Sequence, residues 1–139
     1  MNAKEYLQQA YRLNELIDSN QRELDQLRAL STSISAVDVS KERVQGGADS
    51  HDKIGSIIAK IVDLNDIINN EIDRFVDLKT DIHNKIMLIP DNTEKLVLKY
   101  RYIEFETWES IAVELGYTFQ WVHVLHKRAL KSFEKVLHS

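Results

Sequence analysis

The sequence contains few of the residues that interrupt helices or cross-link a chain. Among its 139 residues there are no cysteines, one proline and four glycines. Without cysteine, disulfides and thiolate metal sites are excluded, and a reducing cytoplasm is the expected compartment. The scarcity of proline and glycine favours long uninterrupted helices over a sheet. The length allows one domain, or one small domain with a helical extension.

Long apolar runs and an excess of positive charge are also missing. The first residues, MNAKEYLQQAYRLNEL, lack the apolar core of a signal peptide. No run approaches the roughly 18 apolar residues that a membrane span requires. We therefore expect a cytoplasmic protein with no membrane partner. The net charge is −4, which is unexpected for a protein that binds nucleic acid.

The first stretch with helical periodicity predicts one helix from about residue 3 to residue 30. Its apolar residues recur alternately every four and three positions, which is a heptad seam. The seam consists of Tyr6, Ala10, Leu13, Ile17, Asn20, Leu24 and Leu27, widened by Leu7, Leu16 and Leu30. Asn20 interrupts the apolar pattern. It either is buried and sets the helix register, or is partly exposed in an imperfect seam.

The periodicity stops from about residue 31 to residue 52. The segment STSISAVDVSKERVQGGADSHD is rich in Ser, Asp and Gly and predicts a surface loop, although it is long for a compact domain. A second interpretation is that the segment Arg43-Val44-Gln45-Gly46-Gly47 docks elsewhere on the protein, because its glycines allow a sharp turn. Of the two interpretations, the sequence favours the loop.

The strongest periodicity belongs to a second helix predicted from about residue 53 to residue 88 or 89. Apolar residues recur every seven positions at Ile54, Ile61, Ile68, Phe75, Ile82 and Ile89, with Ile57, Leu64 and Leu78 beside them. Two long amphipathic helices joined by a loop predict an antiparallel, coiled-coil-like hairpin over residues 1–89.

The second helix also carries Ile58, Ile72 and Ile86 next to its main seam. Its apolar stripe is therefore broader than one partner helix can cover. A homodimer in which two hairpins form a four-helix bundle would cover it, and this is our hypothesis. The alternative is that the C-terminal part of the same chain folds back over the extra surface.

A C-terminal domain is predicted over residues 90–139, because Pro90 stops the long helix. The sequence from Asp91 to Glu94 has the pattern of a capping box, which predicts a helix up to about Ile103. Thr107 is a good N-cap for a further short helix. Its expected inward residues are Trp108, Ile111, Ala112 and Leu115.

The end of the chain has the spacing of a helix-turn-helix, in which the second helix enters the major groove of DNA. Gly116 supplies the permissive backbone that ends the short helix, and Thr118 can cap the last one. Along the last helix, Val122, Leu125 and Ala129 recur at helical spacing and are expected to face inward.

Four motifs follow one another in this domain: Leu98-Lys-Tyr-Arg-Tyr102, Ile111-Ala-Val-Glu-Leu-Gly116, Thr118 and Arg128-Ala-Leu130. Together, over residues 88–137, they resemble region 4 of sigma-70-type factors. The whole chain is similar to small sigma-like proteins from phages and prophages of Gram-positive bacteria, whose better-known relatives regulate late phage transcription. The resemblance implies a non-enzymatic regulator that binds promoter DNA and contacts host RNA polymerase.

Candidate DNA-contacting residues follow from the helical geometry and from this resemblance. Residues 90–139 carry seven basic and seven acidic residues, but from Thr118 onward four basic residues face one acid. Gln120 suits pairing with adenine, whereas His123 and Lys127, which are also expected to point outward, suit phosphate contacts. The full candidate set is Thr118, Phe119, Gln120, Trp121, His123, Val124, Lys127, Arg128 and Lys131, with Arg101 on the supporting helix.

Three of these candidates leave a second interpretation open. Phe119, Trp121 and Val124 depart from the polar pattern of the sigma-like family. Their side chains could contact thymine methyl groups, or they could form an interface with another protein. The alternative function is therefore a protein-interaction module, and a purely structural helical adapter is a third possibility.

The sequence gives little indication of catalysis, cofactors or metals. No Gly-rich phosphate loop and no nucleophile beside a matched base is visible. His123 and His126 lie three residues apart and could bind a metal, but no carboxylate shares their helical turn. A DNA-facing His123 and a packing His126 are favoured. Glu104, Glu106 and Glu109 lie near a helix start, where acids suit the helix dipole.

Overall fold

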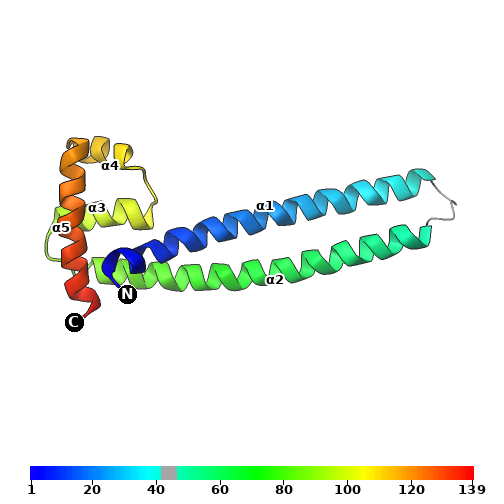
Figure 1. Ribbon diagram of the computed structural model, residues 1–139, viewed down its shortest axis with the longest axis horizontal. Helices are drawn as coiled ribbons and strands as arrows, with labels where there is room; N and C mark the ends of the chain where they lie inside the picture. Colours follow the sequence, from blue (N-terminus) through cyan, green and yellow to red (C-terminus); the bar gives the residue numbers. More distant parts are fainter. Residues whose placement is uncertain (42–46) are drawn as a thin grey trace. The chain divides into compact units, whose positions relative to one another are not determined.

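The computed structural model describes residues 1–41 and 47–139, and in that part of the chain every regular element is a helix. This confirms the predicted all-α class. None of the described helices is long and apolar enough to cross a membrane. The elements are α1 (Ala3–Lys41), α2 (Gly47–Ile86), α3 (Asn92–Leu98), the π-helical segment η1 (Lys99–Ile103), α4 (Trp108–Leu115) and α5 (Phe119–Leu137) (Figure 1).

Both long helices are longer than predicted, so the segment between them is shorter. The loop expected at about 31–52 is wrong in its bounds, because α1 continues to Lys41 and α2 begins at Gly47. The hydroxyl of Thr32 donates to the carbonyl of Arg28 at 3.0 Å, as in a continuing helix. Extending a formed helix requires no new nucleus, so residues of weak propensity can join it. The alternative interpretation, in which Arg43 to Gly47 dock elsewhere, rests on residues 43–46, which lie outside the described residues.

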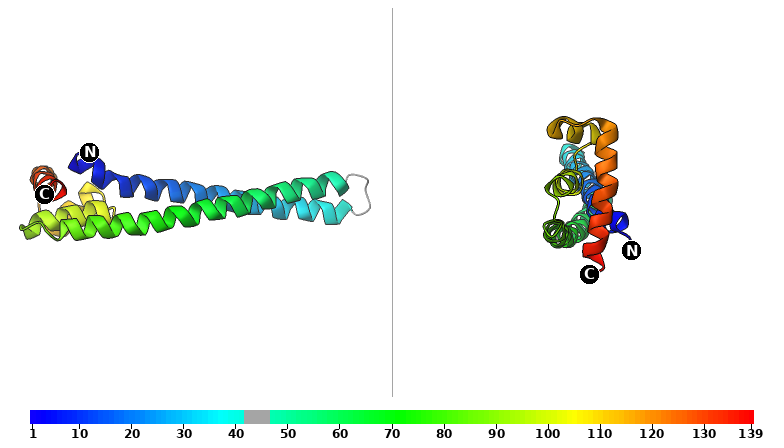
Figure 2. Two further views of the ribbon diagram at one scale, coloured as in Figure 1. Left: turned by 90° about the horizontal axis from the view of Figure 1, so that it is seen from below. Right: turned by 90° about the vertical axis from the view of Figure 1, so that its left-hand side faces the viewer.

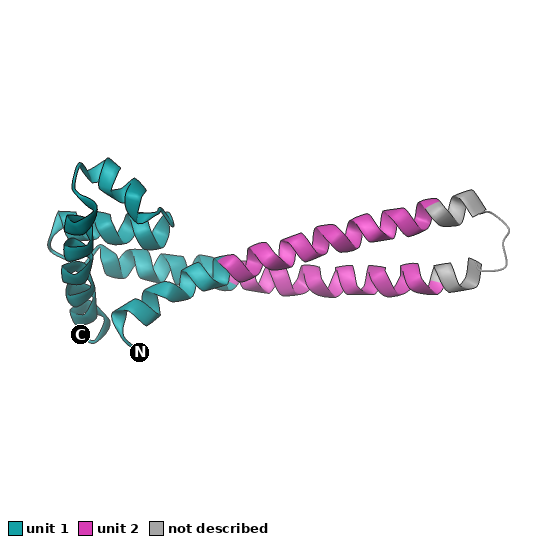
Figure 3. Ribbon diagram, turned by 45° about the horizontal axis from the view of Figure 1, so that its top comes forward, with its two compact units in different colours: residues 1–14, 74–139 teal, residues 15–73 magenta. Residues whose placement is uncertain are grey.

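The chain divides into two compact units (Figure 3). Unit 1 contains residues 1–14 and 74–139, and unit 2 contains residues 15–73. This division differs from the boundary expected between residues 89 and 90. The reason is that the start of α1 and the end of α2 share a core with the C-terminal helices.

Unit 2 is held together by a narrow seam between α1 and α2. Leu24 of α1 packs against Leu64 and Ile68 of α2. Next to this seam, the side-chain amide of Asn20 donates to Glu71 Oε1 at 2.7 Å, and Glu71 is only 8% exposed. Asn20 is therefore half-buried and paired across the seam. Leu16 and Leu30, which were expected to widen the seam, are exposed.

Unit 1 has a core to which α1, α2, α3, η1 and α5 contribute, whereas α4 packs on α5 through a separate cluster. α5 packs against both α3 and α4, as two views show (Figures 1 and 2). The core residues are Ala3, Leu7, Ala10, Ile82, Ile86, Ile89, Leu98, Tyr102, Ala129 and Phe133. Ile86 is thus covered by C-terminal residues of the same chain, which is the alternative that we weighed against a homodimer. Ile58, in unit 2, remains 48% exposed.

Candidate nucleic-acid interface

The connection between α4 and α5 is short and locally determined. Gly116 ends α4 in the left-handed conformation, with φ of 71°, which glycine adopts without strain. Thr118 is the N-cap of α5, and its hydroxyl accepts a hydrogen bond from the amide of Trp121 at 3.1 Å. Thr107 caps α4 in the same way through the amide of Ser110. These three predicted roles are confirmed.

One face of α5 is buried as predicted. Val122 packs with Ile111 and Ala112 of α4, and Leu125 and Ala129 are also buried. The helix is amphipathic, so burying this stripe leaves the opposite side of its first turns to solvent. Contact between the small Ala112 and Val122 keeps the two helices close.

Most of the candidate residues lie on the exposed side of α5, which we call the α5 outer face. It consists of Thr118, Phe119, Gln120, Trp121, Val124, Lys127, Arg128 and Lys131, all of them exposed. The guanidinium of Arg128 lies 5.2 Å from the centre of the Trp121 ring, a cation–π contact that holds both side chains. The α5 outer face therefore combines amide, cationic and aromatic groups.

Two candidate residues do not belong to this face. His123, expected to point outward, is half-buried, with its ring centre 4.9 Å from that of Trp108 and 4.5 Å from that of Phe119. Arg101 is also half-buried: its guanidinium lies 4.4 Å from the centre of the Trp108 ring and donates to the carbonyl of Glu106 at 2.9 Å. Both side chains pack against Trp108, whose large ring lies where α4, η1 and α5 meet.

The predicted packing role of His126 is observed, with a specific partner. His126 is buried, and its Nε2 lies 2.7 Å from the hydroxyl of Tyr102. Burial, followed by electrostatic repulsion from Lys4, His123 and Arg101, lowers the pKa of His126 to about 4. Burial raises the pKa of Tyr102 to about 12, against a smaller opposing effect of Arg101. Both side chains are therefore neutral near pH 7.

The acids near the start of α4 interact with one another. The neighbouring carboxyl group of Glu114 raises the pKa of Glu106, and burial and the charge of Glu104 raise it further. Glu109 and Glu114 are exposed on α4 itself. The exposed surface of α4 therefore carries negative charge, whereas the exposed side of α5 carries Lys127, Arg128 and Lys131.

Residues of α1 also reach this region, which the sequence did not indicate. Lys4, Gln8 and Tyr11 line a cavity together with Arg101, Tyr102 and Trp108. No local pattern could have indicated this, because the two groups lie about ninety residues apart in the chain. Among the described residues, no group of three or more His, Asp or Glu side chains could hold a metal ion.

No protein-family model, no curated protein and no solved structure matches this chain.

Proposed function

We propose that this protein is a DNA-binding transcriptional regulator of the phage or prophage type. In this proposal α4 and α5 act as a helix-turn-helix like that of sigma region 4, and α5 enters the major groove. The observation that carries the proposal is the capped start of α5, which follows α4 after only three residues and leaves its first turns exposed. A recognition helix contacts base edges with these first turns.

The chemistry of the α5 outer face supports this role. Gln120 offers the donor and acceptor pair that matches adenine in the major groove. Lys127, Arg128 and Lys131 suit the neighbouring phosphates, and no salt bridge occupies them within the described residues. Because the whole chain carries a net charge of −4, its non-specific affinity for DNA should be weak. Specific binding should depend strongly on salt, because each phosphate contact releases bound counterions.

Two parts of the proposal rest on other grounds. Contact with host RNA polymerase at a promoter follows from the resemblance to sigma region 4. A homodimer would present two copies of α5 to two half-sites. It is suggested by Ile58, Val62 and Ile67, exposed apolar residues of α2 within unit 2. Light scattering after size-exclusion chromatography would test the dimer, and a monomer mass would remove it.

The DNA-binding proposal is tested by a mobility-shift titration with DNA from the protein's own genomic neighbourhood. Competitor DNA and two salt concentrations should be used. We expect a specific shift that weakens steeply with salt. The variant K127A/R128A/K131A should lose the shift, because it removes the cations expected to contact phosphates.

A matched control comes from unit 2, where Arg28, Lys53 and Lys60 are also exposed. The variant R28A/K53A/K60A removes the same charge and should retain most of the specific shift. If both triple variants lose binding equally, the α5 outer face is not the interface. If folded wild-type protein shifts no fragment, the DNA-binding proposal fails.

A protein-interaction module is the second candidate, supported by the apolar residues of the α5 outer face. Phe119, Trp121 and Val124 are 42%, 40% and 39% exposed and lie within two turns. Exposed aromatic residues are enriched at protein interfaces. The variant F119S/V124S should then abolish capture of purified host polymerase, whereas K127A/R128A/K131A should preserve it.

A further inference from the structure

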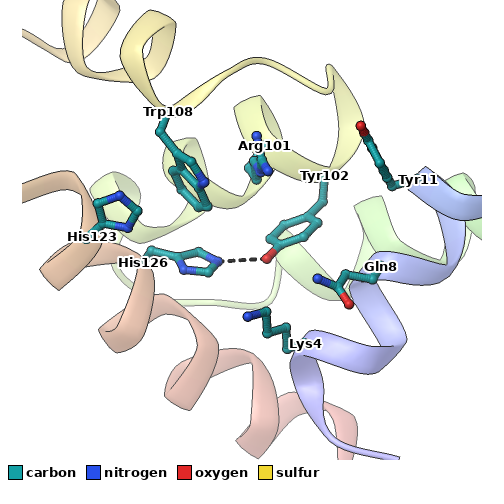
Figure 4. A pocket seen from close by; sticks show the side chains of 8 residues that line it. All are labelled: Lys4, Gln8, Tyr11, Arg101, Tyr102, Trp108, His123 and His126. Atoms are coloured by element: carbon teal, nitrogen blue, oxygen red, sulfur yellow. Dashed lines mark hydrogen bonds between the residues drawn. The ribbon is translucent and has the colours of Figure 1, made fainter. Parts of the chain in front are cut away.

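A cavity of about 290 Å³ lies within unit 1, between the start of α1 and the residues around Trp108 (Figure 4). Its polar wall is formed by Lys4 and Gln8 of α1, Arg101 of η1, and His123 and His126 of α5. The rest of its wall is aromatic. The cavity lies just below the range of about 300–1,000 Å³ that is typical of small-molecule sites, so any ligand must be small.

The cavity is positively charged. Lys4 and Arg101 contribute two cations, and no carboxylate lines the wall. The positive charges of Lys4 and Arg101 both help to lower the pKa of His126, which places them within electrostatic range of one buried point. Cations that converge without a carboxylate repel one another, and a bound anion would relieve this repulsion.

Several donors at the cavity are not used within the described part of the protein. Within those residues, Lys4 and Gln8 donate no side-chain hydrogen bond, and Arg101 donates one, to the carbonyl of Glu106. Figure 4 shows the side chains of Lys4 and Gln8 extending from α1 toward the bonded pair of Tyr102 and His126. An anion at this place would meet donors from α1 and η1 together.

The backbone of η1 and of the residues after it has an unusual conformation beside this cavity. Its π-helical hydrogen bonding, in which the amide of Glu104 donates to the carbonyl of Lys99 at 3.0 Å, lets the consecutive residues Arg101 and Tyr102 both line the cavity. Phe105 follows with φ of 57°, an unfavourable conformation for a bulky residue. π-helical turns and strained residues are concentrated at functional sites.

We propose that this cavity binds a small organic anion, consisting of one aromatic ring with a carboxylate or phosphate group. Lys4 and Arg101 would hold the anionic group, with Gln8 as a further donor. The aromatic walls formed by Tyr11 and Trp108 would enclose the ring.

Binding would connect α1, η1, α4 and α5 of unit 1 through one molecule. His123 and Trp108 line the cavity, and His123 also contacts Phe119 of the α5 outer face. The anion is therefore expected to order the start of α5 and to alter DNA binding. This regulatory step rests on the proposed function, whereas binding of the anion does not.

The test measures tryptophan fluorescence without DNA in the W121F variant, which leaves Trp108 as the only tryptophan. The probes are benzoate and phenyl phosphate, compared with neutral phenol and with inorganic phosphate. We expect saturable quenching by at least one aromatic anion, with a Kd between about 10 µM and 1 mM. A preference for one probe distinguishes a carboxylate ligand from a phosphate ligand.

Lys4→Met should weaken binding of that probe about tenfold, as expected for the loss of one charge-assisted hydrogen bond. Lys4 is exposed, so this change should leave the fold intact. Lys60→Met, in unit 2, is the matched control and should bind like the parent protein. The proposal is overturned if neither aromatic anion binds, if phenol binds equally well, or if Lys4→Met has no effect.

The regulatory step is tested separately by adding the bound probe to the mobility-shift titration. A changed DNA affinity in the parent protein, absent in Lys4→Met, supports it. An unchanged affinity despite measured anion binding refutes the regulatory step alone. An absence of any DNA shift, with anion binding intact, refutes the proposed function alone.

Discussion

The two units of this protein share α1 and α2 but bury side chains to different extents. In unit 1, the side chains of Leu7, Ile82 and Phe133 are completely buried in a core shared by several helices. In unit 2, the best-buried seam residues are Leu24 and Ile68, which retain 5% and 4% exposure. Two helices meet along one line, so most of each surface stays in water, whereas additional helices in unit 1 enclose whole side chains.

The difference in burial should produce a difference in sensitivity to truncation. Phe133→Ala should lower the free energy of unfolding by about 3–5 kcal/mol, because a cavity remains in an enclosed core. Leu24→Ala should cost about 2 kcal/mol, the lower limit for a buried leucine, since the seam can collapse. Denaturant titration gives the change in the free energy of unfolding for each variant. Hydrogen exchange shows in which unit that change is located.

Leu16→Ala is the control for this truncation series, because Leu16 is exposed. It should change stability by less than about 0.5 kcal/mol. An equal cost for Phe133→Ala and Leu24→Ala would contradict the contrast between an enclosed core and an open seam.

Unit 1 should also respond to acid through His126. Its pKa is about 4 in the folded protein, below its ordinary value of 6.5, so the unfolded chain binds the proton more tightly. The stabilising effect of neutral His126 is complete above pH 6.5 and is lost as the pH falls toward 4. The loss can reach about 1.4 kcal/mol per pH unit, and on the order of 2–3 kcal/mol in total.

Unfolding titrations between pH 7 and pH 4 check this expectation. His126→Gln keeps a hydrogen-bonding group near Tyr102 but cannot be protonated, so its stability should depend less on pH. His83→Gln makes the same change at a half-buried histidine of α2 and serves as the control. If the pH dependence of His126→Gln equals that of the wild type, the acid sensitivity arises elsewhere.

A smaller effect is expected at the polar contact of unit 2. Asn20→Leu should cost about 1–2 kcal/mol, because Glu71 then loses its partner in a site where it is only 8% exposed. The double variant N20L/E71L should recover this loss, since an apolar pair can replace a buried polar contact. A double-mutant cycle measured by denaturant unfolding tests the coupling. Additive effects would show that the hydrogen bond contributes little.

Helix ends could be predicted well wherever one residue decides them. Thr107 and Thr118 cap their helices, Gly116 ends α4, and Asp91 accepts from the amide of Glu94. The reciprocal half of the expected capping box is not observed, because the carboxylate of Glu94 instead accepts from the hydroxyl of Ser132 on α5. A tertiary partner replaced the local one.

The candidate interface could be predicted only in part. Helical spacing was sufficient to separate the buried Val122 and Ala129 from the exposed Gln120 and Lys127. Spacing alone could not indicate that Trp108 would cover His123 and Arg101, because that contact depends on how α4, η1 and α5 pack.

The sequence by itself determined the all-helical class, the caps of α4 and α5, and the buried stripe of α5. These depend on backbone preferences and on the helical repeat, which act over a few residues. Only the tertiary structure decided that α1 meets η1 and α5 around a cationic cavity, and that Asn20 pairs with Glu71. Such contacts join residues far apart in the chain, and packing of the helices selects them from many possible partners.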